Sequence, residues 1–284
     1  MKKKFSIGYA VIGGWVRLSA RVFYKQWIVR GKENFPKGDQ PTILISNHQN
    51  GMTDPLMSCL SFRRQLHFLT RADLFQKAWT NAILRSFNML PIYRATDKVG
   101  DLKGRNQDSF DTAHNRLLAG NVISLFPEGN HNNKKWLRPF RKGIARVVFG
   151  AYEKNEFKGN IQIVPVGLDY SNYTDFREKI LINVGKPIST DVYIANYKAD
   201  PAKTLTALTE ETRQALSKQL IDIQSKTHYE AIIMARDVLN TIEGPKSNFA
   251  RDYDRFKAFQ LNADRWVADH QEEADKCQQE TDEL

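Results

Sequence analysis

Short apolar runs alternate with amphipathic stretches over roughly the first 190 residues of the chain. Runs such as Thr42–Ile45 and Val122–Phe126 are predominantly apolar and bounded by turn residues, which is typical of strands buried on both faces. The other runs that predict strands are Gln26–Val29, His67–Leu69, Met89–Tyr93, Ile161–Val166 and Lys179–Val184. This alternation favours an α/β fold with a mostly parallel central sheet flanked by helices.

Longer stretches between these runs carry apolar residues at the spacing of a helix. They predict helices at Leu56–Leu60, residues 73–87, Gln107–Ala119 and Gly143–Glu153. In residues 73–87 the side expected to be buried consists of Leu74, Phe75, Trp79, Ile83, Leu84 and Phe87. Residues 97–105 are charged and predict a mobile connection. Pro165 lacks a backbone N–H, so it favours a strand end, an edge or a bulge.

The pattern becomes helical from about residue 203 to the end of the chain, with a break at Gly244-Pro245. We therefore divide the chain into a domain of residues 1–195 and a helical C-terminal extension of residues 196–284. The role of the extension is left open by the pattern.

The beginning of the chain predicts an amphipathic helix at residues 5–28. One face carries Ile12, Val16, Phe23 and Trp27, with Val11, Trp15 and Val22 beside it and a basic stripe of Arg17, Arg21 and Lys25 on another side. We expect neither a transmembrane helix nor a secretory signal, because no apolar run is long or compact enough. The helix either lies in a membrane interface or packs on the domain as a surface helix. Its many aromatic residues and its lack of acidic ones favour the membrane.

Charge is unevenly distributed along the 284 residues, whose formal net charge is +10. Residues 1–32 hold eight basic residues and no acidic one, whereas residues 269–284 hold seven acidic residues and one basic one. This excess indicates an anionic partner, which is nucleic acid, a phospholipid surface or a phosphorylated substrate. We expect no nucleic acid, because the basic cluster lies on a helix with an apolar face. Cys59 and Cys277 indicate neither a disulfide framework nor a zinc cluster.

Candidate chemistry begins in the segment Ser46–Pro55, which turns through Asn50-Gly51 into a helix. His48 comes directly after a strand, a frequent position for functional residues in α/β proteins. Asp54 follows six residues later. Across a tight turn its carboxylate can hold one ring nitrogen of His48 and leave the other as a general base. Asp54 also suits the N-cap of the helix, so a purely structural role is the alternative.

Two further charged residues, Arg94 and Glu128, each follow an apolar run. The carboxyl ends of parallel strands meet at one edge of a sheet, so we expect both residues to converge with His48. Gly129 has no Cβ and lets a ligand or backbone approach closely. Such a set suits deprotonation of a hydroxyl beside an anionic acceptor. A basic run follows, with Lys134, Lys135, Arg138, Arg141 and Lys142.

These segments together resemble the glycerolipid acyltransferases, in particular the bacterial 1-acylglycerol-3-phosphate acyltransferases. Four blocks match that family in order: Asn47-His48 with Asp54, Pro91–Arg94, Phe126-Pro127-Glu128-Gly129, and Ile163–Gly167. The resemblance covers about residues 25–190, so it makes residues 1–195 an acyltransferase domain.

Two features depart from the family pattern. Five residues rather than four separate His48 and Asp54, and the turn between them has to absorb the extra one. The family's Thr-Arg-Ser after Glu-Gly is replaced by Asn130-His131-Asn132. The candidates to replace the missing arginine as a phosphate ligand are Arg138, Arg141 and Lys142.

The resemblance implies transfer of a fatty acyl group from acyl-CoA or acyl-carrier protein to a lysophospholipid hydroxyl. The expected acceptor is 1-acylglycerol-3-phosphate, which gives phosphatidic acid; a different lipid acceptor is the alternative. His48 would be the general base, oriented by Asp54, and the alkoxide would attack the thioester without a covalent enzyme intermediate. The implied substrate-binding residues are Asn47, Arg94, Phe126, Pro127, Glu128, Gly129, Arg138 and Lys142. No metal or other cofactor is expected, and we expect the protein at the cytoplasmic face of an anionic membrane.

Two other classes compete with this interpretation. The first is a non-catalytic lipid-binding protein on the same fold, which the extra residue between His48 and Asp54 supports. The second is a hydrolase. The chain has no Gly-x-Ser-x-Gly nucleophile turn, so Ser46 beside His48 is a poor candidate nucleophile.

Overall fold

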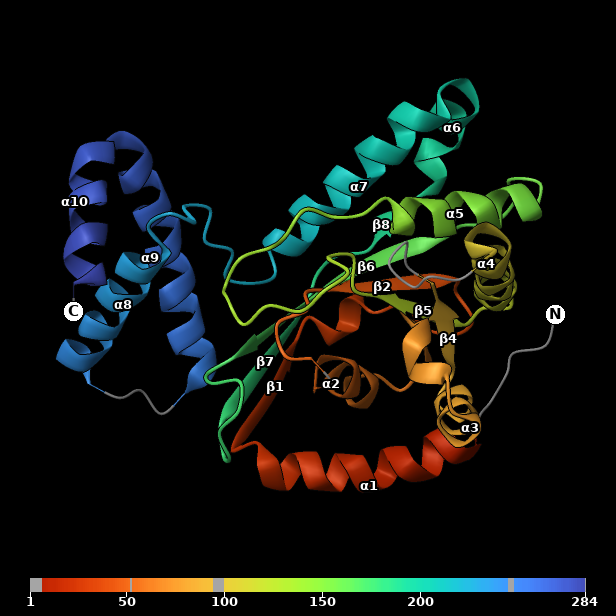
Figure 1. Ribbon diagram of the computed structural model, residues 1–284, viewed down its shortest axis with the longest axis horizontal. Coiled ribbons are helices and arrows are strands. Elements are labelled where there is room, and N and C mark those ends of the chain that lie inside the picture. Colours follow the sequence, from red (N-terminus) through yellow and green to blue (C-terminus); the bar gives the residue numbers. More distant parts are fainter. Residues whose placement is uncertain (1–6, 52, 94–99, 245–247, 284) are drawn as a thin grey trace.

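The computed structural model describes residues 7–51, 53–93, 100–244 and 248–283, which contain an eight-stranded sheet (Figure 1). Its order is β1-β7-β6-β2-β5-β3-β4, with β8 paired to β6. The strands are β1 Gln26–Arg30, β2 Thr42–Ser46, β3 Leu66–Arg71, β4 Met89–Ile92, β5 Val122–Leu125, β6 Gln162–Tyr170, β7 Lys179–Val184 and β8 Ile188–Ser189. These strands pair in parallel, except that β6 is antiparallel to β7 and β8. The predicted mostly parallel α/β fold is confirmed.

Helices cover both faces of the sheet (Figure 1). They are α1 Ile7–Phe23, α2 Thr53–Ser61, α3 Ala78–Ser86, α4 Leu102–Leu118, α5 Gly143–Lys154, α6 Ile194–Ala199, α7 Pro201–Ser217, α8 Tyr229–Glu243, α9 Phe249–Asp269 and α10 Gln271–Asp282. Short 3₁₀ turns occupy Lys32–Asn34, Ala72–Phe75 and Asp191–Tyr193.

The central strand β2 shows how the two layers are built. Ile43 and Ile45 point to the face covered by α4, α5 and α7, whereas Leu44 points to the face covered by α1 and α2. All three side chains are fully buried. A strand covered on both faces needs no polar side, which explains the continuous apolar run in the sequence.

The C-terminal extension divides into two parts. Helix α7 packs on α5 and β6, and its Leu208 and Leu216 belong to the core of the sheet. Helices α8–α10 form a separate cluster with residues such as Tyr229 and Phe256, which also receives Leu181 from β7. This helical group stands beside the β1–β7 side of the sheet (Figure 1).

The helix predicted at residues 73–87 is wrong in extent and in its buried side. The segment splits into the 3₁₀ turn Ala72–Phe75 and α3, and Leu74, Trp79 and Ile83 are exposed. Helix α3 packs at the β4 edge of the sheet, where less of the helix surface is covered. A helical pattern identifies residues that share a face, but it does not say which face finds a neighbour.

Two further local predictions change. Helix α4 begins at Leu102, inside the stretch expected to be a mobile connection, while residues 94–99 lie outside the described residues.

Pro165 lies inside β6, at neither a strand end nor a sheet edge. On one side it pairs in register with Ile45 of β2. On the other side it falls between the pairing of β6 with β8, which ends at Ile163, and the pairing with β7, which begins at Val166. The missing N–H therefore interrupts neither of these ladders.

Helix α1 is shorter than predicted, because the chain enters β1 at Gln26 and carries Trp27 into the sheet. Val16, Ala20 and Phe23 pack against the domain. The exposed apolar residues are Ile7, Val11, Trp15, Leu18 and Val22, which recur at helical spacing on the outer face. Val16 and Phe23 of the face expected to meet a membrane are therefore packed against the domain instead. The side chain of Ile12, on the same predicted face, lies outside the described residues. None of the helices in the described ranges is long and apolar enough to cross a membrane.

We predict that Gly167→Ala lowers the free energy of unfolding by about 1–3 kcal/mol, the usual cost of overpacking a filled site. A Cβ on Gly167 would lie 2.2 Å from the carbonyl oxygen of Gln219. That oxygen cannot move freely, because it accepts hydrogen bonds from Asn183 Nδ2 (2.9 Å) and the Tyr253 hydroxyl (3.0 Å). Urea unfolding measures the change.

The control for this prediction is Gly14→Ala in α1, where an added Cβ meets no atom within 4 Å. Alanine is the better helix former, so this variant should be at least as stable as the original chain. Equal stability of both variants would contradict the close approach of Gln219 to β6.

Candidate active site

The candidate site lies where β2, β5 and β6 end. The loop after β2 carries His48, and the loop after β5 carries Glu128. The backbone N–H of Asn132 donates to the carbonyl oxygen of His48 (3.0 Å), which joins the two loops directly. The parallel register of β2 with β5 and β6 explains why His48 meets Glu128, 80 positions away, and Asn47 meets Leu168, 121 positions away, at this edge.

His48 and Asp54 form a close pair. His48 Nδ1 lies 2.9 Å from Asp54 Oδ2, with 18% of the His48 side chain exposed and none of that of Asp54. The other carboxylate oxygen, Oδ1, accepts a hydrogen bond from the Tyr170 hydroxyl at 2.7 Å. A carboxylate on Nδ1 keeps the proton on that nitrogen, so Nε2 is the basic atom of the ring.

The extra residue between His48 and Asp54 is accommodated by the turn. Asp54 Oδ2 also accepts the backbone N–H of Asn50 at 2.8 Å, and Asn50 in turn accepts the N–H of Thr53. Asp54 lies one residue inside α2, and its carboxylate bonds back to the loop instead of capping the helix. The N-cap interpretation of Asp54 is therefore wrong, because buried donors around the loop occupy the carboxylate.

Two aromatic rings enclose the imidazole of His48. The ring of Phe126 stacks on it with centroids 4.4 Å apart and planes inclined by 23°. His131 meets it edge to face at 5.8 Å. In the part of the chain that the structure describes, Nε2 of His48 has no hydrogen-bond partner. The arrangement leaves the basic nitrogen available for a proton from a bound hydroxyl.

Glu128 connects the two loops. Its Oε1 accepts the backbone N–H of His48 (2.9 Å), and its Oε2 accepts the backbone N–H of Arg138 (3.2 Å). The side chain is buried. Burial raises the pKa of Glu128 to about 7, while the two N–H donors act in the opposite direction. Both oxygens are engaged by backbone, so Glu128 holds the loops in place.

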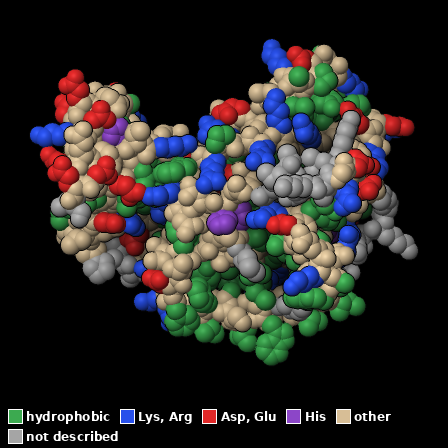
Figure 2. All heavy atoms as spheres, viewed as in Figure 1, with side chains coloured by type: hydrophobic (Ala, Val, Ile, Leu, Met, Phe, Trp, Pro, Cys, Tyr) green, Lys and Arg blue, Asp and Glu red, His purple; other side chains and the backbone are tan. Residues whose placement is uncertain are grey.

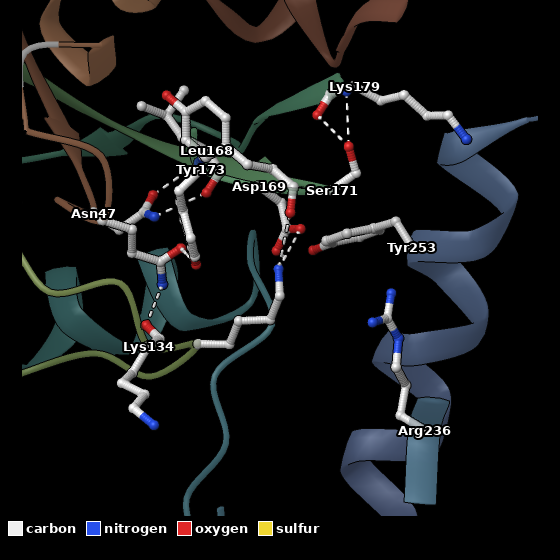
Figure 3. Close-up of polar contacts among 12 residues, drawn as sticks. Asn47, Lys134, Leu168, Asp169, Ser171, Tyr173, Lys179, Arg236 and Tyr253 are labelled. Carbon is white, nitrogen blue, oxygen red and sulfur yellow. Dashed lines mark hydrogen bonds and ion pairs between the residues drawn. The ribbon is translucent and has the colours of Figure 1, made fainter. Parts of the chain in front are cut away.

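The side chain of Asn47 forms hydrogen bonds with the backbone of the neighbouring strand β6. Its amide donates to the carbonyl oxygen of Leu168 and accepts the N–H of the same residue, both at 2.8 Å (Figure 3). The side chain is fully buried, so it extends the pairing of β2 with β6 beyond Ser46. Asn47 thereby fixes the backbone from which His48 projects.

The loop opposite His48 is anchored by a buried ion pair. Lys135 Nζ lies 2.8 Å from Asp169 Oδ1 and also donates to the carbonyl oxygen of Tyr170 (3.2 Å). Gln49 Nε2 donates to the carbonyl oxygen of Lys134 at 2.9 Å. In Figure 3 the side chain of Asp169 on β6 points toward Tyr253 of α9. The ion pair ties the loop after β5 to the strand that supplies Tyr170.

Comparison with known proteins assigns the chain to a family. The family model described as Acyltransferase matches residues 26–169, which is about half of the chain. The chain belongs to the Acyltransferase family. The matched region holds His48, Asp54 and Glu128, whereas α7–α10 lie outside it.

Individual relatives of this acyltransferase-family chain differ in length. It is 28% identical over 112 residues to glycerol-3-phosphate O-acyltransferase 2 of Saccharomyces cerevisiae, which is 39% of this chain and 15% of that protein. It is 21% identical over 204 residues to the 1-acyl-sn-glycerol-3-phosphate acyltransferase of Bacillus subtilis, covering 70% of this chain and 88% of that one. The chain thus spans only a small part of the yeast relative.

A solved structure shares the fold. The crystal structure of the 1-acyl-sn-glycerophosphate acyltransferase from Thermotoga maritima superposes with a TM-score of 0.52 at 18% sequence identity. The match covers 74% of this chain and 78% of that one.

Sequence reasoning missed several residues of the candidate site in this acyltransferase-family chain. Tyr170, Lys135 and Asp169 support the His48–Asp54 pair or its loops, and of these three residues only Asp169 carried a signal in the sequence. Tyr170 ends an apolar strand, and Lys135 stands in a basic run. The polar residue Asp169 inside an apolar strand was the one available clue, because a buried charge needs a partner.

The remaining predicted residues fall into different places. Arg94 lies outside the described residues. Pro127 is buried, and its carbonyl oxygen accepts the N–H of Arg141. Gly129 has φ 76°, and Arg141 packs against it. Arg138 and Lys142 line a pocket whose other wall includes residues of α7. Within the described ranges, no group of three or more His, Cys, Asp or Glu residues is arranged to hold a metal ion.

We predict a distinct pH dependence of stability for Glu128→Gln. The folded protein keeps the proton of Glu128 to about pH 7, whereas an unfolded glutamate releases it near its ordinary pKa of 4.5. The folded state therefore binds more protons in this window, and the free energy of unfolding of the original chain falls as pH rises through it. The fall is about 1.4 kcal/mol per unit of pKa difference, and the variant lacks it.

Urea unfolding of both proteins at several values between pH 4.5 and pH 8 gives this difference. Glutamine also leaves one backbone N–H unpaired, which lowers stability by a pH-independent amount of about 1–3 kcal/mol. The test is therefore how the difference in free energy of unfolding between the two proteins changes with pH, and not the size of that difference at any one pH. A difference that stays constant with pH would contradict the raised pKa of Glu128.

Proposed function

We propose that the protein is a glycerolipid O-acyltransferase that moves a fatty acyl group from a thioester donor to a lysophospholipid hydroxyl. The observation that carries the proposal is the His48–Asp54 pair of 2.9 Å, with Nε2 of His48 unpaired among the described residues. Membership of the Acyltransferase family supports it. The donor is acyl-CoA or acyl-carrier protein.

The proposed reaction proceeds through His48. Nε2 takes the proton of the acceptor hydroxyl as its oxygen attacks the thioester carbonyl. The tetrahedral intermediate collapses, the C–S bond breaks, and the sulfur leaves with the proton that Nε2 returns. Asp54 stabilises the positive charge of the imidazole between these steps, and Tyr170 keeps Asp54 oriented.

The acceptor we propose is 1-acylglycerol-3-phosphate, because the Bacillus subtilis relative named for that substrate aligns over most of its length. Arg94 remains our candidate ligand of the phosphate, and Phe126 would contact the substrate beside His48. We assign Asn47 and Glu128 to positioning, since backbone groups occupy their side chains. The extra residue between His48 and Asp54 no longer supports a non-catalytic role, because the two side chains still form a pair.

We further propose that α1 attaches the protein to an anionic membrane. Its outer face exposes Trp15 (71%), Leu18 (58%) and Val11 (57%), although its inner face is packed. Apolar side chains gather along the lower rim of the molecule in Figure 2, where Figure 1 shows α1. Exposed apolar stripes of this kind are typical of helices that lie in a membrane interface.

We expect His48→Ala to lower turnover by about 100-fold or more, since a positioned general base contributes roughly 10²–10⁴. The assay supplies acyl-CoA or acyl-carrier protein with 1-acylglycerol-3-phosphate and detects phosphatidic acid by mass spectrometry. The control is His270→Ala, because His270 is exposed at the junction of α9 and α10. Activity of His48→Ala within a few-fold of the original, with unchanged thermal unfolding, would exclude the proposed mechanism.

The membrane proposal predicts that Val11→Ser/Trp15→Ser/Leu18→Ser weakens binding to vesicles containing phosphatidylglycerol by at least about tenfold. Each buried apolar side chain contributes about 1.5–3 kcal/mol. Vesicle sedimentation measures the binding. The matched control, Val238→Ser/Ile242→Ser/Leu261→Ser, removes equally exposed apolar residues from α8 and α9. Similar losses in both variants would show that α1 is not the membrane contact.

A further inference from the structure

A basic pocket lies between the loop after β5 and the C-terminal extension. It has a volume of about 450 Å³. Its charged lining consists of Arg138, Lys142, Glu210, Arg213, Asp222 and Lys226. Four of these residues come from α7 and the segment after it, outside the region that matches the Acyltransferase family. Figure 2 shows Lys and Arg side chains gathered in the hollow between the α8–α10 group and the rest of the molecule.

The charges in the pocket do not cancel. Glu210 is occupied by Arg213, whose Nε and Nη2 lie 3.0–3.2 Å from its carboxylate. The other basic residues are oriented by neutral groups: Lys142 Nζ donates to Thr206 Oγ1, and Lys226 lies over the ring of Trp136. As far as the structure describes the chain, Arg138, Lys142 and Lys226 form no ion pair. The pocket therefore favours an anion.

One residue of the pocket lining, Asp222, also has an unpaired hydrogen-bond acceptor among the described residues. Asp222 is 3% exposed, and its Oδ1 accepts the backbone N–H of Leu137 at 2.8 Å. Its Oδ2 is buried and has no partner among the described residues. A phosphate cannot satisfy this oxygen, whereas an amino group or a hydroxyl can. A ligand with phosphates and with donors fits both parts of the pocket.

The pocket is connected to the candidate active site by a single side chain. The carboxylate of Glu128 accepts the backbone N–H of His48 and that of Arg138, so the catalytic loop and the pocket wall meet there. A donor whose thioester lies at His48 would extend past this contact toward Arg138 to reach the pocket. Pockets for cofactor-sized ligands commonly enclose about 300–1,000 Å³.

We propose that this pocket binds the nucleotide end of acyl-CoA, with its phosphates near Arg138, Lys142, Arg213 and Lys226. The adenosine supplies amino and hydroxyl donors for Asp222. The proposal rests on the proposed acyl transfer and selects acyl-CoA over acyl-carrier protein. The phosphopantetheine of acyl-carrier protein is attached through its phosphate to a serine side chain and carries no adenosine. It gives the C-terminal extension a role in choosing the donor.

The first test measures binding without catalysis. Adenosine 3′,5′-bisphosphate, the corresponding fragment of CoA, is titrated into the full-length protein by calorimetry. We expect binding to the original chain and at least about tenfold weaker binding to Arg213→Gln/Lys226→Gln, because charged contacts to phosphate are lost. The control Lys203→Gln/Lys218→Gln removes the same charge from exposed positions of α7 and its end, outside the pocket.

The second test compares two donors that carry the same acyl group. We expect the ratio of kcat/KM for acyl-CoA to that for acyl-pantetheine to fall about tenfold in Arg213→Gln/Lys226→Gln and to hold in the control. An unchanged ratio, no binding of the bisphosphate, or equal losses in both variants would overturn the pocket assignment. A preference of the original chain for acyl-carrier protein would do the same. Nucleotide binding without any acyl transfer would instead refute the proposed function and leave the pocket standing.

Discussion

The buried carboxylate of Asp54 is the constraint on which the candidate site depends. It is fully removed from solvent, so its charge has to be met by donors within the protein. Three donors from separate elements do this: His48 from the loop after β2, the backbone of Asn50 in the turn, and Tyr170 at the end of β6. Displacing any of these elements leaves a buried charge short of a partner. The orientation of the imidazole is thereby coupled to the register of β2 and β6.

A second set of contacts extends this coupling to the C-terminal helices. The carbonyl oxygen of Lys135 accepts the N–H of Ile223, and the N–H of Lys135 donates to the Tyr229 hydroxyl. The loop that carries Glu128 is thus held on its far side by residues outside the family match. The extension belongs to the architecture of the site even though the family pattern does not include it.

Much of the fold could be predicted from the sequence, because strands covered on both faces have to be apolar throughout. The strand predicted at Lys179–Val184 agrees with β7 residue for residue. Predictions about packing were less successful. The exposed Trp79 of α3 and the exposed Trp15 of α1 both lie on helices whose pattern contains more than one apolar side. Which side becomes buried depends on neighbours that the local sequence does not specify.

The sequence by itself determined the order of strands and helices, the position of His48 and Glu128 at strand ends, and the resemblance carried by four short blocks. These features depend on the local spacing of residues, which can be read directly from the sequence. Only the tertiary structure decided that Asp54 meets His48 despite the extra residue, that Tyr170 and Lys135 support the site, and that α7 completes a basic pocket. Those contacts join residues more than 30 positions apart or depend on the path of a turn. Hydrophobic periodicity encodes neither long-range contacts nor the path of a turn.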